Sequence, residues 1–117
     1  AAIIGFDGAA EPGGVLPGPA ELLCAALAAC LLKNVERFSH LLPFHYEAAS
    51  VTVTAEREES PPRIVRLRYR LVVTTNEPEA RLDLLHRNLL RHGTISNTLA
   101  AACELSGELV RAVPDLP

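Results

Sequence analysis

The sequence predicts an α+β domain in which helices lie beside an antiparallel sheet. Three observations predict this class: an apolar helical stretch over residues 19–42, two alternating segments over 46–57 and 63–75, and a second helical stretch over 78–92 with a last alternating segment behind it. This order of elements favours helices set to one side of an antiparallel sheet. The whole chain, 1–117, fits one domain, because no repeat with a period of about 20 to 50 residues is present.

The long helix is expected to follow a loop. Glycines and prolines recur over residues 1–18 and prevent a helix there, although residues 1–6 are compatible with the end of a strand. Pro19 suits a first helical turn, and Glu21 complements the positive helix end. The first half of the helix is apolar on every side, which predicts burial all round and, in so small a chain, a second subunit against it. The second half is amphipathic, with five side chains expected in solvent: Lys33, Asn34, Glu36, Arg37 and His40.

The two alternating segments predict a hairpin packed on one face, with a turn over residues 58–62. The inward faces are expected to hold Val51, Val53, Ala55, Val65, Leu67, Tyr69, Leu71 and Val73. The opposite face of the second segment holds Arg66, Arg68 and Arg70, an apparent anion-binding stripe. A solvent face is the better interpretation, since Glu56 and Glu58 can pair with these arginines across the hairpin. Nucleic-acid binding is not expected, because aromatic platforms for bases are missing.

The second helix presents an apolar face made of Leu82, Leu85 and Leu89, and Gly93 is expected to stop it. His86 and His92 are predicted on its solvated side. Residues 94–97 can cap a short helical turn that runs through Ala101, and residues 104–113 alternate enough for a last strand.

Composition excludes several classes of protein. The formal net charge is −3, which argues against a general nucleic-acid binder. The longest apolar run, residues 22–32, is too short for a membrane span of about 20 residues. No basic residue precedes Lys33, so the positive region of a signal peptide is missing and we expect a cytoplasmic protein. The chain begins at Ala1 without a methionine, which leaves open the loss of an N-terminal strand segment.

The three cysteines, Cys24, Cys30 and Cys103, do not suggest a disulfide framework. Cys24 and Cys30 are six residues apart, as are His86 and His92, and six residues along a helix place side chains roughly 120° apart. Neither pair therefore shares a face, and no metal site is expected. The simplest interpretation of each cysteine is that it is a small, buried hydrophobic side chain without reactivity.

Two segments carry a resemblance to a known family. The first is Gly-Gly-x-x-x-Gly-Pro-Ala-Glu-Leu-Leu-Cys-Ala-Ala-Leu-Ala-Ala-Cys at residues 13–30. The second, Arg-His-Gly-Thr-Ile-Ser-Asn-Thr-Leu at residues 91–99, is similar to a family loop that reads His-Cys-Pro-Val-Ser-Asn-Thr-Leu. In this order and spacing, the chain resembles the OsmC/Ohr family of osmotically inducible and organic hydroperoxide resistance proteins over nearly all of residues 5–113.

The resemblance implies a fold in which two chains intertwine, with long central helices packed between sheets. It also implies a reactive cysteine on the long helix, in a pocket between subunits, whose thiolate attacks a peroxide and becomes a sulfenic acid. In peroxidase members a second cysteine then forms a disulfide, which a thiol reductant reopens. By position, Cys30 matches the attacking cysteine.

The sequence departs from the peroxidase members at three places. Gly93 stands where the second cysteine is found, and Ala20 stands where an acid follows the proline of the motif. Glu21 is the neighbouring acid, rotated by about 100° from the expected position. The family's activating arginine comes from an upstream segment, and nothing basic precedes Lys33. Cys30 and Glu21 are therefore the candidate catalytic residues.

The predicted function is thiol-dependent reduction of organic hydroperoxides in the oxidative stress response, by a homodimer with Cys30 as nucleophile. The Leu and Ala side chains of the helix favour an organic peroxide. An external thiol is expected to complete the cycle, with no metal or organic cofactor. The alternative is a catalytically silent member that binds a small apolar ligand or a protein partner at the dimer interface, and the glycine at 93 and the alanine at 20 favour it.

Overall fold

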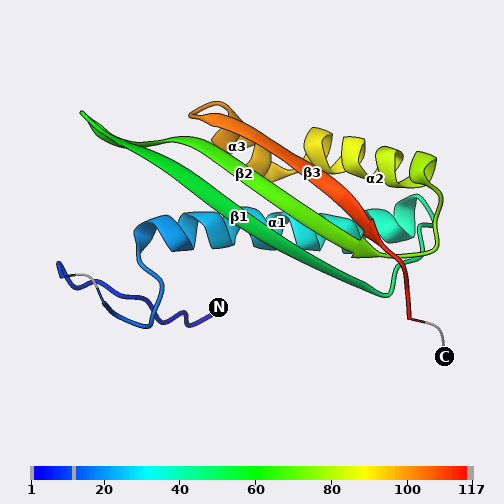
Figure 1. Ribbon diagram of the computed structural model, residues 1–117, viewed down its shortest axis with the longest axis horizontal. Coiled ribbons are helices and arrows are strands. Elements are labelled where there is room, and N and C mark those ends of the chain that lie inside the picture. The colour runs from blue at the N-terminus through cyan, green and yellow to red at the C-terminus, as the bar shows by residue number, and fades with distance from the viewer. Residues whose placement is uncertain (1, 12, 116–117) are drawn as a thin grey trace.

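The computed structural model describes residues 2–11 and 13–115 and confirms the predicted α+β class. Three helices and three strands follow one another in the predicted order (Figure 1): α1 (Pro19–Leu41), β1 (Ala48–Glu59), β2 (Pro62–Thr74), α2 (Glu79–His92), α3 (Thr94–Ala100) and β3 (Glu104–Ala112). In the view of Figure 1 the sheet lies in front and the helices lie behind it, so the helices cover one face of the sheet.

The sheet is mixed, not wholly antiparallel, and has the order β1-β2-β3. β1 and β2 form the predicted antiparallel hairpin, paired from Ala48 opposite Thr74 to Glu59 opposite Pro62. β3 runs parallel to β2, from Glu104 beside Arg66. The prediction of a fully antiparallel sheet was wrong here, because α2 and α3 carry the chain back to the end of the sheet where β2 begins. A helical crossover of this kind joins parallel strands, and side-chain alternation alone says nothing about strand direction.

The core lies between the sheet and the helices, and the central strand and α1 contribute most to it. β2 is paired on both edges, so its inward side chains are covered by neighbours on each side. The predicted apolar face of α2 is confirmed, since Leu82, Leu85 and Leu89 are buried. The other buried apolar side chains are Leu27, Leu31, Val35 and Phe38 of α1, Phe44 of the following link, and Leu67, Tyr69, Leu71 and Val73 of β2.

A β-bulge interrupts the alternation of β2. Glu56 pairs with Arg66 but the next residue, Arg57, pairs with Ile64, so Val65 has no partner in the register. An extra residue in one strand changes which side chains face inward beyond it. Ile64 accordingly packs against the core, and Val65, which the sequence assigned to the inward face, is only partly buried.

α1 is buried on one side only. Leu27, Leu31 and the residues in line with them face the sheet, whereas Ala25, Ala26 and Ala29 are exposed. Burial all round, as the apolar sequence predicted, is therefore wrong for the single chain, because one sheet can cover only one side of a helix. The expectation that Asn34 faces solvent is also wrong, since only 9% of it is exposed.

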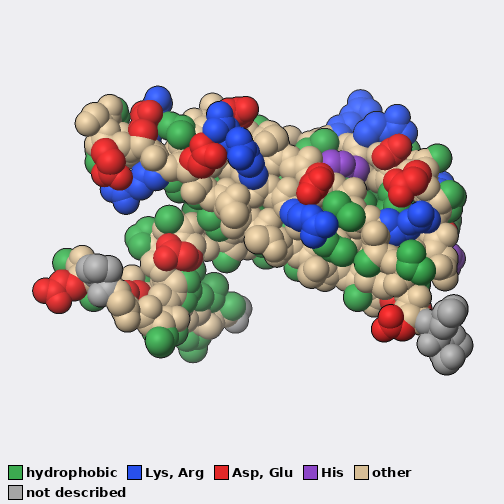
Figure 2. Space-filling model, in the orientation of Figure 1, with side chains coloured by type: hydrophobic (Ala, Val, Ile, Leu, Met, Phe, Trp, Pro, Cys, Tyr) green, Lys and Arg blue, Asp and Glu red, His purple; other side chains and the backbone are tan. Residues whose placement is uncertain are grey.

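The segment before α1 has no regular secondary structure over residues 2–11 and 13–18, so no strand forms at 2–6, and residue 1 lies outside the described residues. This N-terminal segment extends away from the sheet in Figure 1 and forms a separate lobe of the surface in Figure 2. Its large apolar side chains are exposed: Ile3, Ile4, Phe6, Val15 and Leu16.

Candidate active site

Cys30 lies in the middle of α1 and is partly exposed, so a small molecule can reach it. One helical turn further on, the Asn34 side-chain amide donates a hydrogen bond to Cys30 Sγ, with 3.6 Å between nitrogen and sulfur. Side chains four residues apart lie on the same side of a helix, which is why the two meet. The sequence analysis missed Asn34 as a site residue. The signal that points to it is its spacing of four from the candidate nucleophile.

Cys24 faces a different surface, towards β1. It lines a hollow of about 570 Å³ between α1 and β1, together with Glu21, Val51 and Val53. Burial raises the pKa of the Cys24 thiol, and the negative charge of Glu21 raises it further. At neutral pH Cys24 therefore stays in the thiol form, which is a poor nucleophile.

Glu21, the candidate acid, lies with Cys24 and not with Cys30. Nine residues separate Glu21 from Cys30 on the same helix, which places the two on opposite sides and about 13 Å apart along the axis. The structure therefore does not bring the two predicted catalytic residues together. Ala20, in the same first turn, is exposed and lines the hollow beside Cys24.

Cys103 lies between α3 and β3 and is partly buried against the core. Its thiol lies 3.5 Å from the Leu99 carbonyl oxygen, to which it donates a hydrogen bond. All three cysteines are free. The structure thus gives each cysteine a different neighbour: a carboxylate for Cys24, an amide for Cys30 and a backbone carbonyl for Cys103.

Gly93 ends α2, as predicted, and its N–H donates to the Leu89 carbonyl oxygen at 3.2 Å. A Cβ at this position would lie 2.8 Å from Ser96 Oγ and 3.0 Å from Leu89 O, both closer than ordinary contact. The space that a second cysteine would need is therefore already filled. Among the described residues, the buried Ser96 Oγ has no hydrogen-bond partner.

His86 is not on the solvated side of α2, where the sequence placed it. Its ring is partly buried, and its Nε2 lies 2.6 Å from the hydroxyl of Tyr69. Burial lowers the pKa of His86, with Asp83 opposing the shift, and burial also raises the pKa of Tyr69 to about 12. His92 is exposed as predicted, and its ring lies 5.5 Å from that of Phe38.

The arginine stripe of β2 is neutralised by carboxylates on the neighbouring strands. Arg66 pairs with Glu56 at 2.6 Å and with Glu104 at 2.9 Å, and Arg70 pairs with Glu108 at 3.1 Å. Basic and acidic side chains accordingly lie next to each other on the outer face of the sheet in Figure 2. Pairing across the hairpin is confirmed for Glu56, whereas Glu58 pairs with Arg63 near the turn. The stripe therefore alternates basic with acidic side chains on the outer face of the sheet.

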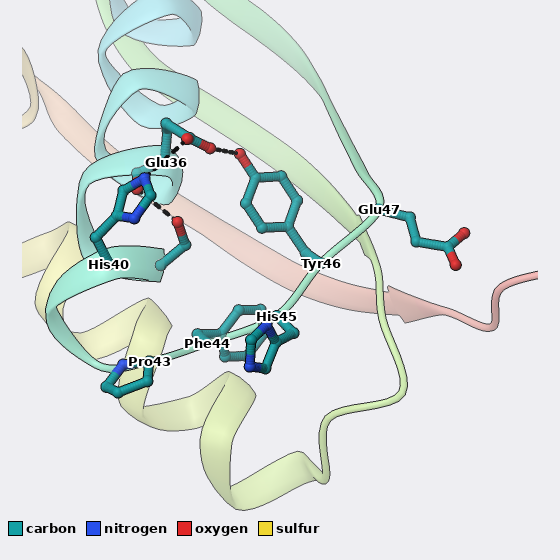
Figure 3. Close-up of a pocket in the computed structure, with 8 residues that line it drawn as sticks. Glu36, His40, Pro43, Phe44, His45, Tyr46 and Glu47 are labelled. Carbon is teal, nitrogen blue, oxygen red and sulfur yellow. Dashed lines mark hydrogen bonds and ion pairs between the residues drawn. The ribbon is translucent and has the colours of Figure 1, made fainter.

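A second hollow, of about 550 Å³, lies where α1 ends and the chain turns into β1 (Figure 3). Within it the Glu36 carboxylate accepts hydrogen bonds from the Tyr46 hydroxyl and from His40 Nε2, the latter at 3.1 Å. These bonds lower the pKa of Glu36, and the carboxylate raises the pKa of Tyr46 to about 12. Three polar side chains of this hollow, Glu36, His40 and Tyr46, thus satisfy one another's hydrogen bonds.

Among residues 2–11 and 13–115, no group of three or more His, Cys, Asp or Glu side chains is placed to hold a metal ion. Nor does any helix in this part of the chain have the length and apolar character needed to cross a membrane.

The model of a protein family described as OsmC-like protein matches residues 12–107. None of the curated proteins matches the chain in sequence. The match spans both α1 with Cys30 and the turn at Gly93.

Solved structures with the same fold share little sequence with the chain. An OsmC-like protein from Mycoplasma pneumoniae has a TM-score of 0.78 at 16% identity, covering 91% of this chain and 79% of that one. An organic hydroperoxide resistance protein from Legionella pneumophila, also described as a predicted redox protein, has a TM-score of 0.72 at 15% identity, with coverages of 83% and 72%. The organic hydroperoxide resistance protein OhrB of Bacillus subtilis has a TM-score of 0.66 at 15% identity, with coverages of 82% and 72%. At these identities the likeness establishes the fold alone.

Proposed function

The chain belongs to the family of OsmC-like proteins, and from this premise we propose that it is a thiol-dependent peroxidase that reduces organic hydroperoxides with Cys30 as the nucleophile. The observation that carries the proposal is the setting of Cys30. It is partly exposed at mid-helix, and a hydrogen-bond donor, Asn34, is directed at its sulfur. By contrast, burial and, to a lesser degree, the Glu21 carboxylate raise the pKa of Cys24 and favour its thiol form.

The proposed reaction begins with the Cys30 thiolate attacking the terminal oxygen of the hydroperoxide. The O–O bond breaks, the terminal OH is transferred to sulfur, and the alkoxide leaves and takes a proton to become the alcohol. Cys30 is then a sulfenic acid. An external thiol condenses with it to give a mixed disulfide and water, and a second thiol restores Cys30 and leaves as the oxidised disulfide.

An external thiol completes the proposed cycle because neither position 93 nor Cys24 can supply a second thiol to the sulfenic acid. Position 93 is a glycine, and the space for a side chain there is filled by Ser96. Cys24 lies about 9 Å from Cys30 along the axis of α1 and on another side of the helix, too far for a disulfide. The cycle we propose therefore uses one cysteine of the protein and no metal or organic cofactor.

We also propose that the active form is a homodimer in the cytoplasm. The exposed alanines of α1, at positions 25, 26 and 29, make a flat apolar strip that water covers in the single chain. The N-terminal segment carries Ile3 fully exposed and Phe6 61% exposed. Apolar surface of this extent is usual for protein contacts and unusual for a monomer. Ala26 and Ala29 lie near Cys30 on the helix. A second subunit on this strip would therefore line the site around Cys30 with apolar side chains and favour an organic peroxide.

The test is the intact mass of the reduced protein after one equivalent of cumene hydroperoxide, for the native chain, Cys30→Ser and Cys24→Ser. We expect one added oxygen, or a mixed disulfide when a small thiol is present, in the native chain and in Cys24→Ser but not in Cys30→Ser. Steady turnover with dithiothreitol should follow the same pattern. An unchanged mass of the native protein would exclude the peroxidase.

A second candidate function has its own support. Glu21 lies beside Cys24, away from Cys30, and the place of the second cysteine is filled. These two features favour a catalytically silent protein that binds a small apolar ligand or a protein partner at the dimer interface. If the mass of the native protein does not change, the same sample is titrated with a solvatochromic apolar dye, and saturable binding that a bulky residue at Ala29 abolishes supports this second function.

A further inference from the structure

Asn34 is a polar side chain on the buried face of α1. It lies in line with Leu27, Leu31 and Phe38, which pack into the core, and only 9% of it is exposed. Burying an amide costs free energy unless the amide is hydrogen-bonded. Its Nδ2 donates to the Sγ of Cys30, 3.6 Å away. An apolar residue of the same size would fill the position without this cost, so a role directed at the sulfur accounts for the amide.

We propose that Asn34 is the hydrogen-bond donor that stabilises negative charge on Cys30 during the reaction, an assignment that rests on the proposed peroxidase function. A thiol sulfur is a weak acceptor, whereas a thiolate is a charged one and forms a much stronger bond with an N–H. The bond therefore gains strength as the proton leaves the sulfur. The amide itself stays neutral and gives up no proton, so it favours the charged sulfur without taking part in proton transfer.

The surroundings of Asn34 make a neutral donor effective. It is fixed between core side chains, so little reorganisation is needed when charge develops on the sulfur, and a donor already in place contributes more than one that must move. Partial exclusion of water strengthens the interaction further. The charged side chains that follow Cys30 on the helix are engaged elsewhere or exposed: Glu36 is held by Tyr46 and His40, Arg37 lies over the Phe38 ring at 5.6 Å, and Lys33 is exposed.

The same helix contains a matched control. Cys24 is also partly buried on α1, but burial and then the neighbouring Glu21 carboxylate raise the pKa of its thiol. Removing the Asn34 amide should therefore slow Cys30 and leave Cys24 unchanged. A general loosening of the fold would instead make both cysteines react faster.

The experiment uses two single-cysteine forms, one retaining Cys30 (Cys24→Ser, Cys103→Ser) and one retaining Cys24 (Cys30→Ser, Cys103→Ser). Each is combined with Asn34→Leu, which keeps the size but removes the donor, and with Asn34→Asp, which keeps the shape but replaces the donor by a negative acceptor. The second-order rate of alkylation by iodoacetamide at pH 7 is measured, with circular dichroism and thermal melting as checks of folding. For Cys30 we expect about a tenfold loss with Leu and a larger loss with Asp, the effect of one hydrogen bond to a charged group. For Cys24 the rate should stay within a factor of two.

The outcomes separate the donor assignment from the peroxidase function. If folded Asn34→Leu alkylates Cys30 as fast as the parent, the assignment is wrong. If Asn34→Asp is faster than the parent, the thiol donates to residue 34 and the assignment is also wrong. If the Leu variant is slow but the parent fails to reduce cumene hydroperoxide, Asn34 is the donor and the peroxidase function fails. The Leu variant alone decides the matter if the buried aspartate prevents folding.

Discussion

At the level of single residues, the position of the Tyr69 ring depends on the absence of a side chain at Gly107. They are neighbours on the parallel strands β2 and β3, and the ring of Tyr69 lies over Gly107, in the space where a Cβ would be. This position lets the Tyr69 hydroxyl reach His86 on α2, at 2.6 Å. Gly107 is thus needed for its lack of a side chain and not for an unusual backbone angle.

We expect Gly107→Ala to lower the free energy of unfolding by about 1 to 3 kcal/mol, because the added methyl group overlaps the Tyr69 ring and forces it to move. Urea unfolding measures the change. Ser106→Ala is the control, since the preceding side chain is exposed on the outer face of the sheet. The decrease in the free energy of unfolding should be smaller when Gly107→Ala is made in a Tyr69→Leu background. An equal decrease in both backgrounds would contradict the proposed overlap.

The residues of the site were predictable to different degrees. Cys30 is found from its motif, because the motif fixes a position on the helix. The environment of Asn34 and His86 is not found, because a polar residue next to an apolar stripe can face either way. In the structure both side chains turn away from solvent and have a hydrogen-bond partner: Cys30 Sγ for Asn34 and the Tyr69 hydroxyl for His86.

At the scale of the elements, one side chain joins the end of α1 to α2. Arg81, in the first turns of α2, donates to the carbonyl oxygen of Leu42 and to that of Pro43, the latter at 3.3 Å. The last carbonyl groups of a helix have no partner within it and carry partial negative charge. The guanidinium group of Arg81 satisfies the carbonyl of the C-cap residue, Leu42, and the one just beyond it, and so holds the two helices together at one end.

Arg81→Met should therefore lower the free energy of unfolding by about 1 to 2 kcal/mol, since it removes a charged donor from partly buried carbonyl groups but keeps the apolar stem. Arg87→Met, at an exposed position of the same helix, is the matched control and should change stability by less than about 0.5 kcal/mol. The free energies of unfolding of the two variants are compared by chemical denaturation. Equal stability of both variants would show that the contact of Arg81 contributes nothing.

The elements themselves follow closely from the sequence. α1 begins at Pro19, whose fixed φ suits a first helical turn, and α2 ends at His92, before Gly93, as the sequence predicted. The direction of β3 and the bulge at Val65 do not follow, because each is decided by the path of distant segments. Local pattern thus predicts where an element lies, and tertiary contacts decide what it pairs with.

At the scale of the whole molecule, one side of α1 remains uncovered. The sheet, α2 and α3 pack against the helix from other directions and leave the alanines at 25, 26 and 29 exposed. The apolar sequence of α1 therefore correctly indicated more apolar surface than one chain buries. What it did not reveal is that the uncovered surface forms a single strip next to Cys30.

The proposed homodimer predicts a mass in solution of twice the 12.6 kDa of one chain, measured by light scattering after gel filtration. Ala29→Glu places a charge in the middle of the strip and should shift the protein to the monomer mass. Ala80→Glu, at an exposed alanine in the first turn of α2, should leave the mass unchanged. A monomeric native protein, or a dimer that tolerates Ala29→Glu, would place the interface elsewhere.

The parallel pairing of β2 with β3 has a consequence for how the chain folds. The hairpin of β1 and β2 closes through a short turn, whereas Arg66 and Glu104, which pair, are 38 positions apart in sequence. Closing a longer loop costs more entropy, so β3 is expected to add last, after α2 and α3 have formed. Until then β2, the most apolar strand, has one open edge, and open edges recruit strands from other chains. We therefore expect aggregation through the apolar edge of β2 to be a hazard until β3 has paired with it, after which β1 and β3 form the edges of the sheet.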